Sequence, residues 1–191
     1  MYWYKKLNIR PSANKRGFLL LLTAGLLVAA TGCKPDIKNS SSEAYFDIAG
    51  YFKAQTRELN KQNPSVNKTA THNGQSETKT VKIGNWDGEF EQFIASDINK
   101  PAWRQSYTVT NGTGITVYKA RSPELKTQKV ILKQVDGKLQ WIYIYNHNKN
   151  LLFESYEDLA YYPDSVYTIK KWQHVKLMGV NRYEIKGEVV K

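Results

Sequence analysis

The second half of the chain alternates between apolar and polar residues, and this period of two predicts β-strands whose two faces differ in polarity. Gly, Asn, Asp and Pro residues separate the alternating segments, as expected of turns. Seven strands are predicted in this half: 106–110, 115–120, 127–135, 138–146, 151–156, 165–175 and 181–190. Two earlier strands, 66–71 and 76–83, flank Asn73 and Gly74, which suit a two-residue hairpin turn because both positions take positive φ.

The turns also predict which residues lie opposite each other on neighbouring strands. The first hairpin places Val66 opposite Val81, and the Asp-Gly turn of a later hairpin pairs Val135 with Lys138. Uninterrupted pairing from that turn gives the opposite pairs Leu132 and Trp141, Val130 and Tyr143, and Ile131 and Ile142. Both faces of this hairpin are therefore expected to be partly covered.

Two segments show the helical period instead. From 43 to 62, apolar positions recur every three or four residues, on a stripe formed by Tyr45, Ile48, Phe52, Gln55 and Leu59. Ser40 with Glu43 has the spacing of a capping box, and Asn63 with Pro64 ends the helix.

A second helix is predicted after Asn85, which suits the capping position, and Pro101 lies beyond its end. Its apolar face is formed by Trp86, Phe90, Phe93 and Ile94. The predicted fold class is α+β: two N-terminal helices packed on an antiparallel β-meander of about nine strands, with a curled or half-open barrel as an alternative form of the sheet.

The N-terminal segment has the layout of a secretory signal. Residues 1–16 hold five basic residues and no acid, and an apolar run follows from Gly17 to Gly32. This run is shorter than the about 20 apolar residues that cross a bilayer, so cleavage is favoured over an uncleaved anchor helix.

Cys33 is the only cysteine of the chain and directly follows the small residues 29–32. This arrangement resembles the lipobox of bacterial lipoproteins, although Ala30 stands where that family most often has Leu. The resemblance implies a signal peptide over 1–32, a diacylglycerol-modified Cys33 as the mature N-terminus, and acylation of the freed amine. The alternative reading is a buried or stray thiol, which would be an unpaired liability in an oxidising compartment.

Residues 33–42 are polar and fit a tether that leads to a single domain over 43–191. The residue after the lipidated cysteine is Lys34 rather than Asp, which in bacterial lipoproteins favours outer-membrane delivery. Lys34 and Asp36 are also similar to export signals of Bacteroidetes surface lipoproteins. The expected location is thus the cell envelope, lipid-anchored, with the periplasmic and surface faces both open.

The net charge of the chain does not point to a particular partner. Residues 1–32 hold five of the 28 basic residues and none of the 17 acids, so their removal leaves a formal net charge of +6. Without a basic run or recognition helix, this charge does not indicate nucleic acid. A domain of this length can bury a core without disulfides, and we expect a monomer.

No catalytic, metal or cofactor motif stands out. His72, His147 and His174 lack metal-ligand spacing, and Gly112 with Gly114 lies between strands, as a turn would. The acids form two groups that are interpreted as solvated faces: Asp87, Glu89 and Glu91, and then Glu154, Glu157, Asp158 and Asp164. The expected protein is not an enzyme and needs no cofactor, and a hydrolase using these acids is the weakest alternative.

The unusual feature is a crowd of aromatic residues near the C-terminus: Trp141, Tyr143, Tyr145, Tyr156, Tyr161, Tyr162, Tyr167 and Trp172. Trp141, Tyr143 and Tyr145 alternate along one strand and must share a face. They form either a ligand surface or part of the core, and the strand propensity of aromatic residues favours the core.

Two functions remain open. The main hypothesis is a lipid-anchored, non-catalytic binding module for a peptide, glycan or protein partner. The alternative is a carrier of a lipid or another apolar ligand in a half-open barrel. A filled core with an exposed aromatic strip would favour the module, and a large apolar cavity between helices and sheet would favour the carrier.

Overall fold

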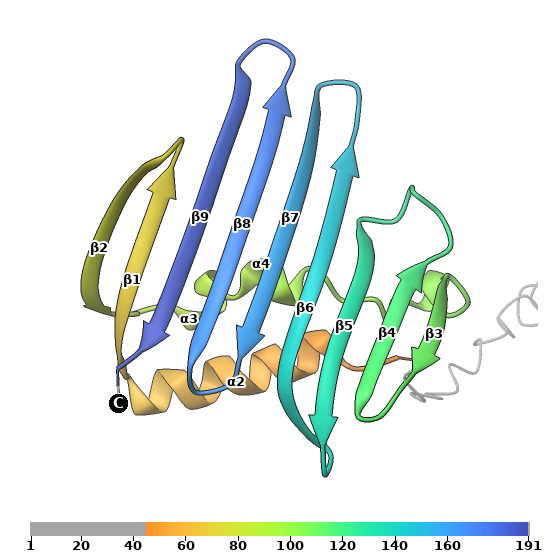
Figure 1. Cartoon of the computed structure of the whole chain (residues 1–191), viewed down its shortest axis with the longest axis horizontal. Coiled ribbons are helices and arrows are strands. Elements are labelled where there is room, and N and C mark those ends of the chain that lie inside the picture. The colour runs from red at the N-terminus through yellow and green to blue at the C-terminus, as the bar shows by residue number, and fades with distance from the viewer. Residues whose placement is uncertain (1–44, 191) are drawn as a thin grey trace, which may run out of the picture. The chain divides into compact units, whose positions relative to one another are not determined.

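Nine antiparallel strands form one sheet in this computed structural model, which describes residues 45–190 (Figure 1). The strand order is β2-β1-β9-β8-β7-β6-β5-β4-β3. The strands are β1 (Ser65–His72), β2 (Gln75–Lys82), β3 (Tyr107–Asn111), β4 (Ile115–Ala120), β5 (Thr127–Val135), β6 (Lys138–Lys149), β7 (Phe153–Tyr162), β8 (Val166–Val175) and β9 (Gly179–Val189). Since β2 and β3 are the two edges, the sheet is open and does not close into a barrel.

The first hairpin matches its predicted register. Val66 lies opposite Val81, and both Asn73 and Gly74 have positive φ, at 48° and 89°. This hairpin does not continue into β3 as part of a simple meander. Its strand β1 instead pairs with β9, so the first and the last strand in the chain lie beside each other in the sheet.

The long helix α2 (Ile48–Gln62) begins later than predicted. Its N-terminus is capped by Asp47, whose carboxylate accepts a hydrogen bond from the Gly50 N–H at 2.7 Å. The predicted capping pair at 40 and 43 lies outside the described residues. The predicted end is confirmed, because Asn63 adopts the left-handed conformation there and its N–H bonds to the Leu59 carbonyl.

The second helical segment is broken into short pieces and lies between β2 and β3, so it is not N-terminal to the sheet. It consists of α3 (Trp86–Glu89), α4 (Glu91–Ile94) and the 3₁₀ turn η1 (Pro101–Trp103). Asn85 caps α3 as predicted, by accepting from the Gly88 N–H. The helix is interrupted at Phe90, whose φ and ψ of −99° and 12° lie outside the helical region.

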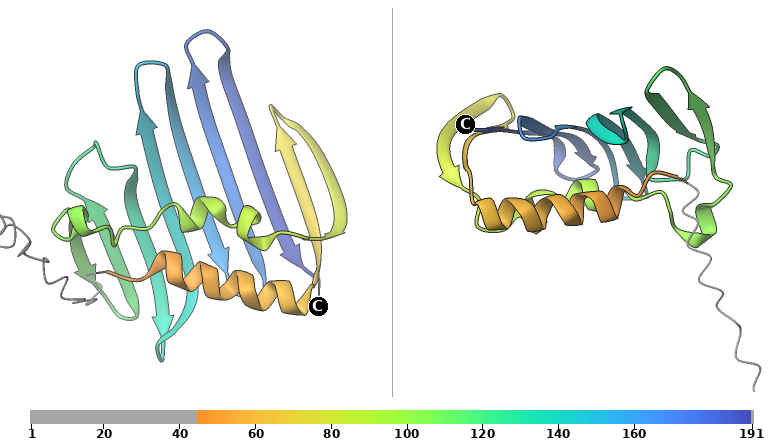
Figure 2. Two further views of the ribbon diagram at one scale, coloured as in Figure 1. Left: turned by 180° about the vertical axis from the view of Figure 1, so that it is seen from behind. Right: turned by 90° about the horizontal axis from the view of Figure 1, so that it is seen from below.

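All the helices cover the same face of the sheet (Figure 2). Aromatic rings fill the space between them, with Phe52 from α2 stacked on Phe93 at 4.5 Å and Phe90 within 5.4 Å of Tyr161. These four side chains are almost entirely buried. The core is thus packed with side chains rather than hollow, which is the arrangement that the module hypothesis expects.

The Asp-Gly hairpin begins with the predicted pair Val135 and Lys138, but the rest of its predicted register is wrong. A bulge interrupts the ladder between Lys133 and Gln134, and one extra residue of β6 is left without a partner. The observed opposite pairs are Leu132 and Ile142, Val130 and Ile144, and Ile131 and Tyr143. Since a one-residue shift exchanges the two faces of a strand, the bulge places the rings of β6 on the face opposite Leu132 and Val130.

Strand β7 also differs from the prediction. It runs from Phe153 to Tyr162, so Leu151 and Leu152 lie in the turn before it rather than in the strand. The turn forms because the Asn150 carboxamide oxygen accepts from the Leu152 and Phe153 N–H groups at 2.8 and 3.0 Å.

Candidate binding surface

The face of the sheet opposite the helices, called here the helix-free face, carries the three rings that the sequence singled out. Trp141, Tyr143 and Tyr145 share this face and are partly exposed, whereas the intervening Ile142 and Ile144 are fully buried under the helices. The bulge described above is what turns the rings outward.

A second set of rings continues the surface across three strands. His147 on β6 lies opposite Tyr156 on β7, which lies opposite Trp172 on β8 and then Arg182 on β9. The His147 and Tyr156 rings stack at 4.5 Å with 5° between their planes, and Tyr156 meets Trp172 at 5.3 Å. This row, 147–156–172–182, ends in a guanidinium group and adjoins Tyr145, which stacks on Tyr156 at 6.4 Å.

Hydrogen bonds to Glu154 hold the first two rings of this row, His147 and Tyr156, in place. Its carboxylate contacts the Tyr156 hydroxyl at 2.8 Å, His147 Nε2 at 3.0 Å and Lys149 Nζ at 3.3 Å. The hydrogen bonds from Tyr156 and His147 lower the pKa of Glu154, and the bond to Glu154 raises the pKa of Tyr156. Tyr156 therefore stays protonated as a donor, with Glu154 ionised as its acceptor.

Asp158 holds the Tyr143 ring in a similar way. The Tyr143 hydroxyl donates to the Asp158 carboxylate. Burial, followed by that hydrogen bond, raises the pKa of Tyr143 well above its ordinary value, and burial with the charge of Asp158 raises that of Tyr145. Both hydroxyl groups therefore keep their protons at neutral pH.

A cavity of about 720 Å³ lies beside the row, over β7 to β9 and the turn after β1. Tyr156, Trp172 and Arg182 line it together with Asp158, Lys170 and Glu184. Its size is that of a small-molecule or oligomer-segment site, and its lining combines rings with charged groups of both signs.

The acids and the cations of the helix-free face differ in how they are paired. The four acids that the strands place there each have a partner: Glu154 as above, Asp158 with Tyr143, Glu184 with Lys170 at 3.1 Å, and Glu188 with Lys186 at 2.7 Å. In contrast, none of the carboxylates in the described chain lies within ion-pair distance of Lys119, Lys129, Lys133 or Arg182.

The unpaired cations lie next to the rings. Lys133 is opposite Trp141 and Lys129 is opposite Tyr145 across β5 and β6. Lys119 lies directly opposite Lys129 on β4, an arrangement of like charges that destabilises a sheet. Pattern analysis of single strands could not find this group, because the three lysines come from two strands and meet the rings only through the register.

The helix-covered face buries the carboxylate of Glu157 among other polar groups. Glu157 was expected on a solvated face but is only 5% exposed, and it contacts Lys171 Nζ at 3.1 Å, Asn146 Nδ2 at 3.1 Å and Lys126 Nζ at 3.7 Å. The buried Asn146 Oδ1 has no protein partner, and both residues line a cavity of about 300 Å³ beside α4. Such a site is suited to buried water.

The remaining sequence-predicted sites have separate outcomes. Cys33 lies outside the described residues. His72 stacks on Tyr183 at the end of β1, far along the sheet from His147, and residues 45–190 contain no cluster of His, Cys, Asp and Glu able to hold a metal ion. In the same part of the chain, none of the helices combines the length and apolar character that crossing a membrane requires.

Comparisons with protein-family models, with curated proteins and with solved structures found no match to this chain.

Proposed function

We propose that the protein is a non-catalytic binding module whose helix-free face binds an acidic glycan. The observation that carries the proposal is a repeated pairing of ring and cation across neighbouring strands: Trp141 with Lys133, Tyr145 with Lys129, and Trp172 with Arg182. Rings pack on the apolar faces of sugars, and unpaired ammonium and guanidinium groups bind carboxylates. A glycan with acidic groups offers both.

The spacing of these pairs favours an extended ligand over a single small molecule. The pairs lie on β5 and β6 at one side and on β8 and β9 at the other, and neighbouring strands are about 4.8 Å apart. A linear chain that crosses the strands can contact all of them, with one segment in the 720 Å³ cavity beside Arg182. Its carboxylates would also relieve the repulsion between Lys119 and Lys129.

A titration by calorimetry tests this directly. The purified chain should bind an oligogalacturonate more tightly than a neutral cello-oligosaccharide of the same length, and the affinity should fall as salt is added. Polyglutamate of matched charge separates ring contact from charge alone. If polyglutamate binds as tightly as the oligogalacturonate, the rings contribute nothing and the glycan proposal is wrong.

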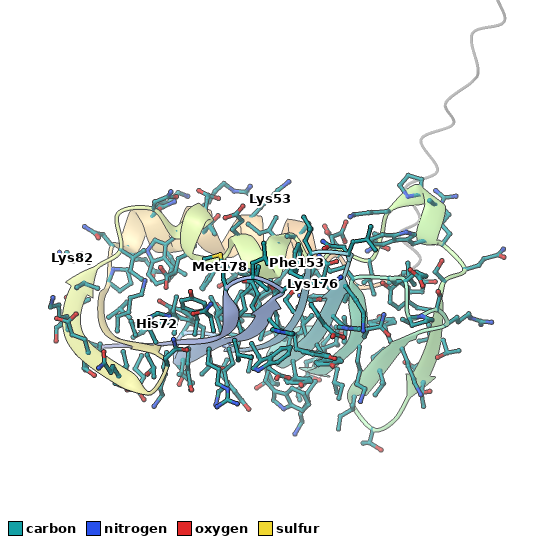
Figure 3. The ribbon with its side chains drawn as sticks, turned by 90° about the horizontal axis from the view of Figure 1, so that it is seen from above. Lys53, His72, Lys82, Phe153, Lys176 and Met178 are labelled. Atoms are coloured by element: carbon teal, nitrogen blue, oxygen red, sulfur yellow. The ribbon has the colours of Figure 1, made fainter. Side chains whose placement is uncertain are left out.

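Matched variants locate the site. Lys129→Gln/Lys133→Gln should weaken oligogalacturonate binding by about tenfold, since two solvent-exposed charge pairs are lost. The control is Lys53→Gln/Arg57→Gln, which removes two exposed cations from α2 on the other side of the sheet (Figure 3, where Lys53 is labelled). Equal loss in both variants would mean that binding follows net charge and not this face.

We further propose that Cys33 carries lipid and anchors the domain in a bacterial cell envelope, with the outer membrane favoured. The short apolar run that ends at this lone cysteine supports the proposal. Intact-mass analysis of membrane-extracted protein should give a chain that begins at Cys33 and carries acyl groups. A mature chain that begins elsewhere contradicts the anchor.

A further inference from the structure

Two long hairpins of the sheet, β6–β7 and β8–β9, end in apolar tips. The β6–β7 turn exposes Leu151 and Leu152, at 83% and 71%, and the β8–β9 turn exposes Leu177 and Met178, at 98% and 77%. No other large hydrophobic side chain in residues 45–190 is more than half exposed. Four large aliphatic side chains in open solvent at one end of a sheet are unusual for a monomeric soluble domain.

The tips form one surface, called here the hairpin-tip patch (Leu151, Leu152, Leu177 and Met178). The Lys176 N–H donates to the Leu152 carbonyl at 3.1 Å, which ties the two turns together. Both hairpins project in the same direction, beyond the level of the helices (Figure 1). In the view onto this end, Phe153, Lys176 and Met178 are labelled close together (Figure 3).

Folding gives no reason for these apolar side chains. The first turn is held by Asn150, and the second by the Met178 N–H, which donates to the Val175 carbonyl at 3.0 Å. These bonds use backbone groups and the Asn150 side chain, so polar residues would serve equally well at the four tip positions. The fold therefore does not require apolar side chains at these positions.

The surroundings of the patch indicate what it contacts outside the domain. Lys149 and Lys176 flank the two turns. Glu154, near the start of β7, is already bonded to Lys149 and His147, and within the described chain Lys176 has no carboxylate partner. Apolar tips with lysines just behind them match a bilayer, in which hydrocarbon lies beneath anionic phosphate groups.

A protein partner fits the patch less well. Protein interfaces rely on Trp, Tyr and Arg anchors in central pockets, and Leu is under-represented among their energetically dominant residues. The patch consists of aliphatic side chains on two convex tips, and its lysines are the type of side chain that reaches from apolar surroundings to a polar interface.

From these observations we infer that the hairpin-tip patch inserts into the interface of an anionic lipid bilayer, with Lys149 and Lys176 at the level of the phosphates. This contact is separate from glycan binding by the helix-free face. It is also separate from the proposed lipid on Cys33, because the tips and the N-terminus would contact the bilayer independently.

The test measures the position of the tips themselves. In a Cys33→Ser background, which has no acylation site, Leu152→Cys is labelled with an environment-sensitive dye and mixed with vesicles of phosphatidylglycerol and phosphatidylethanolamine. The matched control carries the label at Val135, which is also exposed but lies at the β5–β6 turn, at the opposite end of the sheet (Figure 1). We expect a blue shift, and quenching by lipid-bound spin labels, at position 152 and not at 135.

Four further results are decisive. Leu177→Ser/Met178→Ser should weaken the affinity for vesicles, measured by the label at position 152, by about a hundredfold, because each of the two inserted side chains contributes roughly tenfold in affinity. Labels at 152 and 135 that respond alike, or a label at 152 that stays in water, overturn the inference. A blue shift without vesicles, together with a dimer in light scattering, would assign the patch to a second copy of the chain and overturn it as well.

Discussion

Replacing Phe90 by Ala tests whether the helix-covered face is the real core. The Phe90 side chain is fully buried at the junction of α3 and α4. Its ring centroid lies 5.2 to 5.6 Å from those of five other rings: Phe52, Trp86, Phe93, Tyr161 and Tyr167. We expect Phe90→Ala to lower the free energy of unfolding by about 4 to 5 kcal/mol, the upper part of the range for Phe→Ala, because so many ring contacts are lost with the buried area.

Urea denaturation followed by circular dichroism measures this loss, with an unchanged slope showing that the unfolded states are comparable. Trp172→Ala is the matched control, since it removes a larger ring from the helix-free face. Trp172 is partly exposed and its closest ring is Tyr156 at 5.3 Å, so its loss should cost only on the order of 1 to 2 kcal/mol.

The contrast between the two variants is the result that matters. A cost below about 1 kcal/mol for Phe90→Ala would mean that the helices do not cover a packed core. Equal large costs for both variants would mean that the rings of the helix-free face are structural, and the binding surface would lose its main support.

Three further measurements follow from local geometry. Gly187→Ala should destabilise the protein by about 1 to 3 kcal/mol in the same urea assay, because an added Cβ would lie 2.2 Å from carbons of the Tyr167 ring; an unchanged midpoint would refute this contact. Hydrogen bonds lower the pKa of Glu154 in the folded protein, so they stabilise the fold above about pH 4.5, and this contribution is lost as the pH falls. In Glu154→Gln, the free energy of unfolding should therefore fall less steeply than in the parent as the pH is lowered. An equally steep fall in both proteins would contradict the assignment. At the alkaline end, burial raises the pKa of the Tyr51 hydroxyl to about 12. The stability that the protonated, buried hydroxyl contributes is therefore complete below about pH 10 and is lost as the pH rises further. The tyrosinate absorbance of Tyr51, taken as the difference between the parent and Tyr51→Phe, should therefore rise together with unfolding measured by circular dichroism. A difference that appears well ahead of unfolding would show that the ring is exposed.

Local patterns predicted the elements of the fold well. The Asn-Gly turn set the pairing of Val66 with Val81, and Asn63 ended α2 where expected, because a turn or a cap depends on a few neighbouring residues. The antiparallel sheet of about nine strands followed from the period of two. The start of α2 was misjudged since two nearby residues, Ser40 and Asp47, both have the chemistry of a cap.

The pairing of strands that are far apart in the sequence could not be predicted from local patterns. The pairing of β1 with β9 joins segments more than 100 residues apart, as the hydrogen bond between Asn73 and Arg182 illustrates with a separation of 109 residues. No local preference encodes such a pair. It forms because the β1–β2 hairpin and β9 each leave a strand edge with unpaired backbone groups until they meet.

The binding surface shows most clearly what the sequence determines and what the tertiary structure determines. The sequence alone determined that Trp141, Tyr143 and Tyr145 share one face of a strand, since side chains alternate along any strand. Which face they share was decided by one unpaired residue of β6, at a bulge where the buried Ile142 and Ile144 remain under the helices only if the register shifts. Packing of the core, which depends on all the elements at once, turned these rings outward, and the same register brought Lys129, Lys133 and Arg182 beside aromatic partners from other parts of the chain.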